Sequence, residues 1–232
     1  MRMMLAVTGA VAALLADASA ELKGDAEAIA RVDSMIERLG GADIWASART
    51  LTLVYHGWRT EPSEPVIETA IRDLIEPVQQ MTFEGRSFVT TFAMTPKASW
   101  LVRTNGVRRF TEDEHALNVA FFDFDFYTIL RNLAAGDDRI SVRAEGERIV
   151  RLTGPEGADW GWFEIDATGQ PVRWGASYGD EPLEYLYGPV KSFGNINFPA
   201  WGTASDGSWR FDYDVVDVDR EAPDLNLTPP RR

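Results

Sequence analysis

The sequence contains no cysteine, and it contains only two histidines, His56 and His115. Without cysteine, the chain forms no disulfide, has no thiol nucleophile and offers no thiolate ligand to a metal. Two isolated histidines do not build a His-rich metal site, and both are interpreted as structural or solvated. The sequence also lacks a Gly-x-Ser-x-Gly elbow, a phosphate-binding loop and a dinucleotide fingerprint. We therefore expect no metal and no cofactor.

The sequence also has no excess of positively charged residues, since its formal net charge is −13 at pH 7. A balance of this sign argues against nucleic acid and against anionic membrane surfaces as main partners. No fixed-period repeat and no low-complexity segment occurs.

The first 20 residues have the pattern of a signal peptide. Arg2 precedes an apolar run over Met3–Leu15, and Ala18-Ser19-Ala20 supplies small residues at the cleavage position. The run is shorter than the ~20 apolar residues that a spanning helix needs. The pattern predicts export to the periplasm or secretion, with cleavage near Ala20-Glu21 and no transmembrane segment in the mature chain.

The remaining chain is expected to form a single domain over 21–222, followed by a loose Pro-rich tail over 223–232. Its first element is an amphipathic helix over Asp25–Leu39, which ends at Gly40-Gly41.

Two runs of strand-like segments follow, with alternating side chains and short turns such as Asn105-Gly106. Short connections imply antiparallel pairing. A sheet of this many strands curls strongly or closes, and two helices are available to cover its concave face. The predicted class is thus α+β with mostly antiparallel strands.

After the first 20 residues, the densest apolar segment is Phe121–Gly136, and it lies between the two strand runs. Asp125 is a suitable N-cap, and Gly136 suits the left-handed position at the helix end. The first interpretation is a core helix over 125–136 with an extended aromatic entry. The alternative is a lid over an apolar cavity, formed by Phe122, Phe124, Phe126, Ile129, Leu130 and Leu133.

Aromatic side chains from several strands are the candidates for lining such a cavity, because each buries roughly 150–250 Å² of surface. The candidates are Tyr55, Phe83, Phe88, Phe92, Trp100, Phe110, Trp162 and Trp174. Alternation along the strands predicts that Phe163 and Ile165 face one way and Trp160 and Trp162 the other. In the last strand it groups Phe211, Tyr213 and Val215.

Three segments resemble the LolA-like periplasmic proteins. They are AIARVDSMIERLGGADIWASARTLTLVYHG (28–57), FYTILRNLAAGD (126–137) and YGPVKSFGNINFPAWGTASDGSWRFDYDVVDVD (187–219), in which a short strand ending in Phe-Pro precedes a final long strand. The resemblance implies a strongly curved half-barrel sheet, with helices against its concave face and a hydrophobic cavity between them.

Three functions are compatible with these patterns. The first is a non-enzymatic carrier for a lipid or the acyl chain of a lipoprotein, with release through movement of the 121–136 segment. The second is an envelope sensor that binds a protein. The third is a hydrolase that uses paired carboxylates and would show a cleft with two carboxyl groups, at least one with a raised pKa. Asp123 with Asp125 and Asp212 with Asp214 are spaced for one strand face, although a solvated polar face explains both pairs.

Overall fold

The computed structural model describes residues 22–60, 63–225 and 227–228. The predicted signal peptide, 1–20, lies outside the described residues, and the predicted tail is described only at 223–225 and 227–228.

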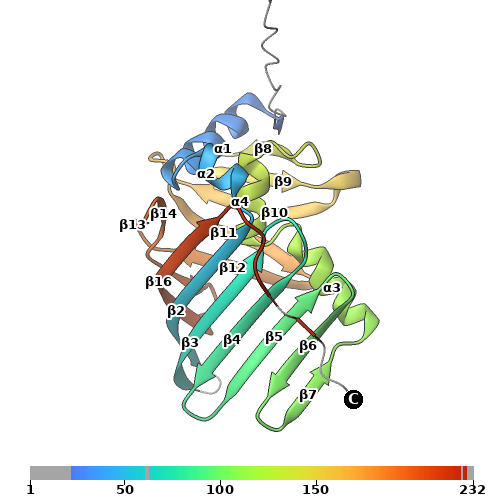
Figure 1. Ribbon diagram of the computed structural model, residues 1–232. Helices are drawn as coiled ribbons and strands as arrows, with labels where there is room; N and C mark the ends of the chain where they lie inside the picture. Colours follow the sequence, from blue (N-terminus) through green and yellow to red (C-terminus); the bar gives the residue numbers. More distant parts are fainter. Residues whose placement is uncertain (1–21, 61–62, 226, 229–232) are drawn as a thin grey trace, which may run out of the picture.

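The first helices are short and lie together at one end of the molecule (Figure 1). Helix α1 (Ala26–Arg38) buries Val32, Met35 and Ile36 on one stripe, as the amphipathic pattern predicts. Gly40 and Gly41 have φ of 122° and 95°, so the chain leaves the helix in a conformation that favours glycine. Helix α2 (Ala42–Ser47) follows at once and buries Trp45.

Most of the chain forms one sheet of fourteen strands, in the order β1-β8-β9-β10-β11-β12-β15-β16-β2-β3-β4-β5-β6-β7. All neighbouring strands are antiparallel except β1 and β8, which are parallel. The strands are β1 (Lys23–Gly24), β2 (Thr50–Thr60), β3 (Ser63–Asp73), β4 (Gln79–Gly85), β5 (Val89–Thr95), β6 (Ala98–Arg103), β7 (Gly106–Arg109), β8 (Ser141–Glu145), β9 (Ile149–Thr153), β10 (Asp159–Ile165), β11 (Pro171–Tyr178), β12 (Glu181–Tyr187), β15 (Trp201–Ala204) and β16 (Trp209–Asp219). A separate hairpin joins β13 (Val190–Phe193) to β14 (Ile196–Pro199), and Pro155–Gly157 form a 3-10 turn.

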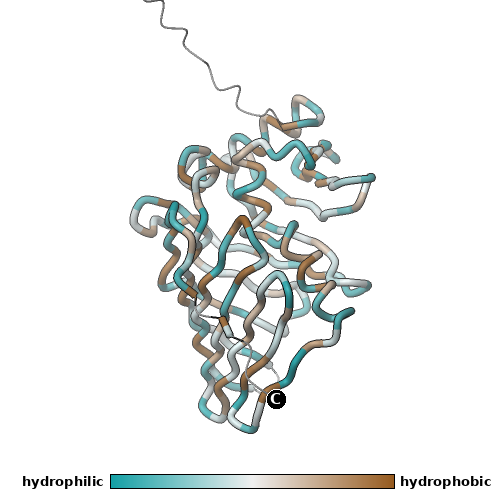
Figure 2. Tube along the Cα trace, turned by 45° about the vertical axis from the view of Figure 1, so that its right-hand side comes forward, coloured by the Kyte–Doolittle hydropathy of each residue, from teal (hydrophilic) through white to brown (hydrophobic). Residues whose placement is uncertain are grey.

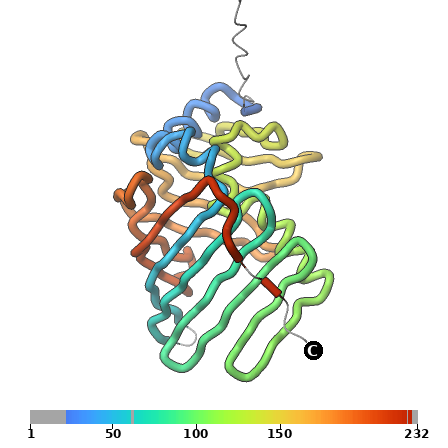
Figure 3. Tube along the Cα trace, viewed as in Figure 1, coloured from blue at the N-terminus to red at the C-terminus, as the bar shows by residue number. Residues whose placement is uncertain are grey.

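The sheet is large, curved and open, which confirms the predicted α+β class with mostly antiparallel strands. Within the described part of the chain its edge strands are β1 and β7, so it does not close into a barrel. Figure 3 shows that the last strand, β16, lies beside the early strand β2, which joins the two strand runs at the middle of the sheet. Apolar and polar residues alternate along the long strands (Figure 2), because one face packs on the core and the other meets solvent.

Two bulges change which side chains face the core, and both correct the simple alternation predicted from the sequence. In β16 the register with β2 shifts between Tyr213 and Val215. As a result Val215 is 41% exposed and Val216 only 3%, which is opposite to the prediction.

In β10 the register with β9 shifts between Asp159 and Gly161. Trp160 therefore lies in the core with Phe163, whereas the alternation placed them on opposite faces. The extra residue in a bulge is invisible to a period-two pattern.

The central segment forms two helices, α3 (Glu112–Phe122) and α4 (Phe126–Ala134), joined by a tight turn. Asp125 caps α4 through Tyr127 N and Thr128 N, and Gly136 has φ of 65°, so the predicted helix after Asp125 is confirmed. The extended entry is wrong, because α3 begins at a capping box between Thr111 and Glu114 and continues to Phe122. The apolar and polar residues of α3 do not segregate onto two faces, which hid this helix from the sequence pattern.

Candidate functional site

The concave face of β16, β2 and β3 carries rows of side chains set by strand register. Tyr55 lies between Tyr213 and Glu68, and Leu53 lies beside Ala70. The ring centroid of Tyr55 lies 5.0 Å from that of Phe211 and 5.5 Å from that of Tyr213, so three strand residues form a continuous aromatic wall.

The facing wall comes from the other half of the sheet and from the helices. Trp174 on β11 stands opposite Tyr185 on β12, and their rings stack at 6.1 Å. Phe126 of α4 stacks on Tyr187 at 4.6 Å, and Phe121 of α3 lies 6.4 Å from Trp174. The turn between α3 and α4 thus places aromatic rings against the concave face of the sheet.

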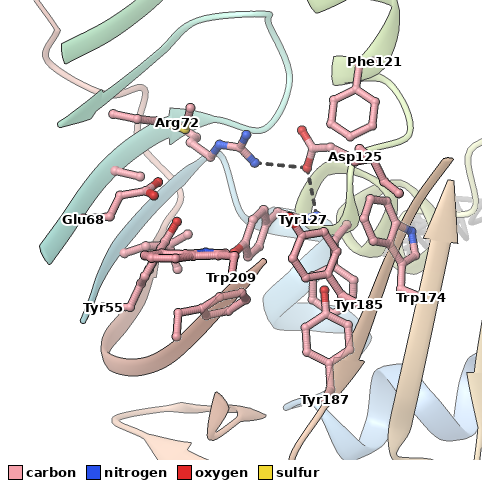
Figure 4. Close-up of a pocket in the computed structure, with 16 residues that line it drawn as sticks. Tyr55, Glu68, Arg72, Phe121, Asp125, Tyr127, Trp174, Tyr185, Tyr187 and Trp209 are labelled. Carbon is pink, nitrogen blue, oxygen red and sulfur yellow. Dashed lines mark hydrogen bonds and ion pairs between the residues drawn. The ribbon is translucent and has the colours of Figure 1, made fainter. Parts of the chain in front are cut away.

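A cavity of about 170 Å³ lies between these walls (Figure 4). Its lining is mostly aromatic and aliphatic. Glu68, Arg72 and Asp125 are its charged lining residues. An apolar cavity of similar size holds a small ring such as benzene. Drug-sized ligands occupy roughly 300–1,000 Å³, so the present volume accepts a ring or a short alkyl segment.

Glu68 is the ionisable group with the most unusual environment. Its side chain is buried on the inner face of β3, and burial raises the pKa of its carboxyl to about 7. A hydrogen bond from Tyr55 and the charges of Arg72 and Arg59 act against this rise. Near neutral pH the carboxyl therefore switches between a neutral donor and an anion.

Arg72 and Asp125 form a buried ion pair that connects the sheet to the helices. Arg72 Nη1 lies 3.1 Å from Asp125 Oδ1, and Arg72 Nε donates to Gln79 Oε1 at 2.7 Å. Asp125 also accepts from Tyr127 N, Thr128 N and Thr128 Oγ1. Because its oxygens are already occupied, Asp125 serves as a helix cap and as the charge partner of Arg72.

Buried tyrosines supply the remaining polar atoms. The hydroxyls of Tyr127 and Tyr213 share a hydrogen bond of 2.7 Å, and the guanidinium of Arg72 lies 5.0 Å from the ring centroid of Tyr127. Burial raises the pKa of Tyr55, Tyr127 and Tyr213 above the ordinary value, so all three stay neutral and act through hydrogen bonds.

Three of the predicted ligand-binding residues meet at this cavity, namely Tyr55, Phe126 and Trp174. Ile129, Leu130 and Leu133 are buried in the main core, where Phe124 packs at its margin. Phe92 and Phe122 form a second cluster under α3, with Phe110 packed against it.

The other four predicted residues lie apart from the cavity lining. Phe83 stacks with Arg59, and Phe88 covers Gly85 at the end of β4. Trp100 is buried on β6. Trp162 points to the opposite face of the sheet from Trp174, where it lies over Gly175 and stacks with Arg173.

Sequence reasoning missed Glu68 and Arg72, together with the aromatic residues Tyr185, Tyr187, Trp209 and Phe211. A signal for the charged pair is present in β3. Glu68 and Arg72 share the phase of Val66 and Ala70, whereas Ile67 lies on the other face and is 51% exposed. Charged residues in phase with the buried positions of a strand indicate a polar site in the interior.

The histidines and the Asp212–Asp214 pair take no part in the cavity. His56 Nδ1 lies 2.8 Å from Asp214 Oδ2 on the exposed face of the sheet. His115, near the start of α3, has its Nδ1 2.9 Å from Ser99 Oγ on β6. Asp123 pairs with Arg139 at the surface, at 3.2 Å.

No protein-family model matches the chain, and no curated protein matches its sequence. The chain is similar to a solved structure, that of a DUF1329 family protein from Desulfovibrio piger, with 9% identity and a TM-score of 0.47. The match covers 86% of this chain and 94% of the other. Among the described helices, none has the length and apolar character needed to cross a membrane.

Proposed function

We propose that this chain is an exported periplasmic protein that binds and carries a lipid or acylated ligand and catalyses no reaction. Export rests on the signal-peptide pattern of residues 1–20. Binding is supported by one observation above all, the aromatic cavity enclosed between the concave sheet and the turn joining α3 to α4. Apolar walls with a few convergent polar groups are typical of ligand pockets.

Entry of a whole acyl chain requires the cavity to expand, because its present volume is about 170 Å³. Phe121 lies in the last turn of α3, Asp125 lies in the α3–α4 turn and Phe126 begins α4, so movement of this turn with the helix ends beside it would widen the space. The Arg72–Asp125 ion pair holds the turn against β3 and would break or rearrange on opening. The α3–α4 turn is therefore the proposed lid.

Two leucine substitutions on one strand test the cavity directly. Leu183 lines the cavity and also the edge of the hollow beside Trp162, whereas Leu186 lies three residues along β12 on the opposite face and is 37% exposed. The indole of Leu183→Trp occupies cavity space, and we expect it to weaken binding of a dansyl-labelled fatty acid about tenfold or more. Leu186→Trp adds the same side chain outside and is expected to leave the affinity within twofold.

Both variants are first checked for an unchanged circular dichroism spectrum and urea midpoint. Equal affinities for the two folded variants would show that the fatty acid binds elsewhere. Wild-type protein that takes up none of the probe, and that carries no lipid when isolated from the periplasm, would refute the carrier function.

A second candidate function is favoured by Glu68. A carboxyl group with a pKa of about 7 is suited to general acid–base catalysis, and the cavity holds a second carboxyl group, Asp125. A hydrolase of this kind would lose activity by about 10²–10⁴-fold in Glu68→Gln. Screening fluorogenic esters and glycosides with wild type and Glu68→Gln tests this, and the carrier function predicts no turnover by either protein.

A further inference from the structure

Arg59 lies at the end of the aromatic wall. Tyr55, Gly57 and Arg59 occupy successive inward-facing positions on β2, and Gly57 has no side chain. It stands opposite Trp209 on β16 and Glu64 on β3. Its guanidinium carbon lies 5.0 Å from the Trp209 ring centroid and 4.9 Å from the Phe83 ring centroid. Two aromatic faces thus fix the position of one half-buried cation.

No carboxylate pairs with Arg59 among the described residues. Glu64, its neighbour on β3, accepts from Arg86 N at 2.9 Å and from Ser87 Oγ at 2.7 Å. Asp206, in the turn between β15 and β16, accepts from Ser208 N at 2.9 Å. Glu64 and Asp206 therefore hold turns. The charge of Arg59 acts on Glu68, but the two form no ion pair among the described residues, so the guanidinium of Arg59 has no carboxylate in direct contact.

The space around Arg59 adjoins the aromatic cavity. An outer hollow of about 480 Å³ is lined by Arg59, Thr60, Ser208, Tyr185 and Trp209. Tyr185 and Trp209 also line the inner cavity, so the two spaces share these walls. A molecule with its apolar end in the inner cavity would pass Trp209 and present its other end to Arg59.

We propose that Arg59 binds the anionic end group of an amphiphilic ligand, a carboxylate or a phosphate, whose alkyl part occupies the aromatic cavity. This inference rests on the proposed function and adds the chemical class of the ligand. A guanidinium recognises carboxylate and phosphate oxygens through charge-assisted hydrogen bonds. In a chain with a net charge of −13, a cation that lies beside an apolar cavity and forms no ion pair among the described residues favours ligands of negative charge.

The test compares four ligands that share a ten-carbon chain: decanoate, decyl phosphate, 1-decanol and decyltrimethylammonium. Each competes with the dansyl-labelled fatty acid for wild type, Arg59→Gln, Arg59→Lys and Arg103→Gln at low salt. Arg103 is an exposed arginine on β6, so Arg103→Gln changes the net charge equally at a distant place.

We expect wild type to bind the anionic ligands at least tenfold more tightly than 1-decanol, and the cation most weakly. Arg59→Gln should lose this tenfold preference while its affinity for 1-decanol changes less than threefold. Arg59→Lys should keep part of the preference, and Arg103→Gln all of it. The stronger of decanoate and decyl phosphate identifies the end group as carboxylate or phosphate.

Equal binding of the anions and 1-decanol by wild type would overturn the inference and leave the carrier function intact. A parallel loss of anion and alcohol affinity in Arg59→Gln would also overturn it, because that pattern indicates a structural role. Tightest binding of the cation would refute it and point to Glu68 instead. Failure of wild type to bind any of the four ligands would refute both the inference and the carrier function.

Discussion

Tyr55 and Glu68 occupy directly opposed positions on β2 and β3, and the tyrosine acts against the rise in the pKa of the buried carboxyl. This pair places an ionisable group with a pKa of about 7 on an otherwise aromatic wall. Because the group is buried, its protonation state affects both the stability of the fold and the polarity of the cavity.

The stability of the protein should therefore fall as pH rises from about 5 to 8. The folded protein holds a proton on Glu68 up to a pKa of about 7, whereas the unfolded chain releases it near the ordinary value of 4.5. The unfolded state thus binds fewer protons in this window, and the stabilising contribution is lost as pH approaches 8. From the two pKa values the loss is about 2–3 kcal/mol.

Glu68→Gln removes this dependence, since the amide stays neutral and still accepts from Tyr55. We expect its free energy of unfolding, relative to wild type, to rise by about 2–3 kcal/mol between pH 5 and 8. Urea unfolding at both pH values measures the effect, with the exposed Glu84→Gln as control. A difference between variant and wild type that is the same at pH 5 and pH 8 would contradict the raised pKa.

A second prediction concerns the charge that holds the proposed lid. Asp125→Asn retains a helix cap but leaves the buried guanidinium of Arg72 without its anion, and breaking a buried pair costs about 3–5 kcal/mol. Asp123→Asn, two residues earlier, removes the ion pair with Arg139, in which the Asp123 side chain is 39% exposed. This change should lower the free energy of unfolding by less than about 1 kcal/mol. Urea unfolding of the two variants gives the comparison, and similar losses would show that the Arg72–Asp125 pair contributes no more than a surface pair.

Local signals were sufficient to predict the parts of the fold that depend on neighbouring residues. Asp125 and Gly136 were identified as the ends of α4, because a cap and a left-handed glycine are determined within one turn. The antiparallel curved sheet followed from alternation and short turns. Thr111–Glu114 is compatible in the sequence with an acidic loop or a helix start, and the structure has the helix start. The extent of α3 to Phe122 is not predicted, because its apolar residues form no single stripe.

The cavity depends on contacts that the sequence does not display. Tyr55 and Trp174 line the same cavity only because the sheet curls and places β2 and β11 on facing walls. The bulges at Trp160 and Asp214 reverse which face of the sheet the following side chains occupy. An alternating pattern of apolar and polar residues does not reveal such bulges. Glu68 was detectable in principle from its phase with Val66 and Ala70. Of the groups that act on its pKa, Tyr55 and Arg59 belong to β2, and only the pairing of β2 with β3 brings them near Glu68.

A third prediction uses the space that Gly57 leaves for Trp209. A Cβ at position 57 would lie 2.3 Å from the carbonyl oxygen of Arg210 and 2.7 Å from the Trp209 ring. Gly57→Ala must therefore displace the β16 backbone at Arg210 as well as the Trp209 indole, at a cost of at least about 1–3 kcal/mol. We expect altered near-ultraviolet circular dichroism and weaker binding of decanoate. A changed spectrum with unchanged affinity would show that the indole position is not needed for binding, and an unchanged spectrum would contradict the predicted displacement.

The last prediction separates two tryptophans that the sequence placed in one group. Trp174 lines the cavity, whereas Trp162 lies on the other face of the sheet, over Gly175. The indole nitrogen of Trp174 is buried with no hydrogen-bond partner among the described residues, so Trp174→Phe loses no hydrogen bond and should fold. Its smaller ring enlarges the cavity and removes part of the contact wall.

Quenching by a bromine-substituted fatty acid reports which indoles lie near the ligand. Removal of Trp174 should abolish part of the quenching seen in wild type and change the affinity, because its indole touches the space that the ligand fills. Trp162→Phe should leave the absolute quenching amplitude and the affinity as they are, since the sheet stands between Trp162 and the cavity. If Trp162→Phe instead removes the quenching, the ligand binds on the outer face, in the hollow that Trp162 lines with Arg151 and Glu184. The ligand site would then have to be sought between β10, β11 and β12 on that face, where the guanidinium of Arg173 lies 5.3 Å from the Trp162 ring centroid.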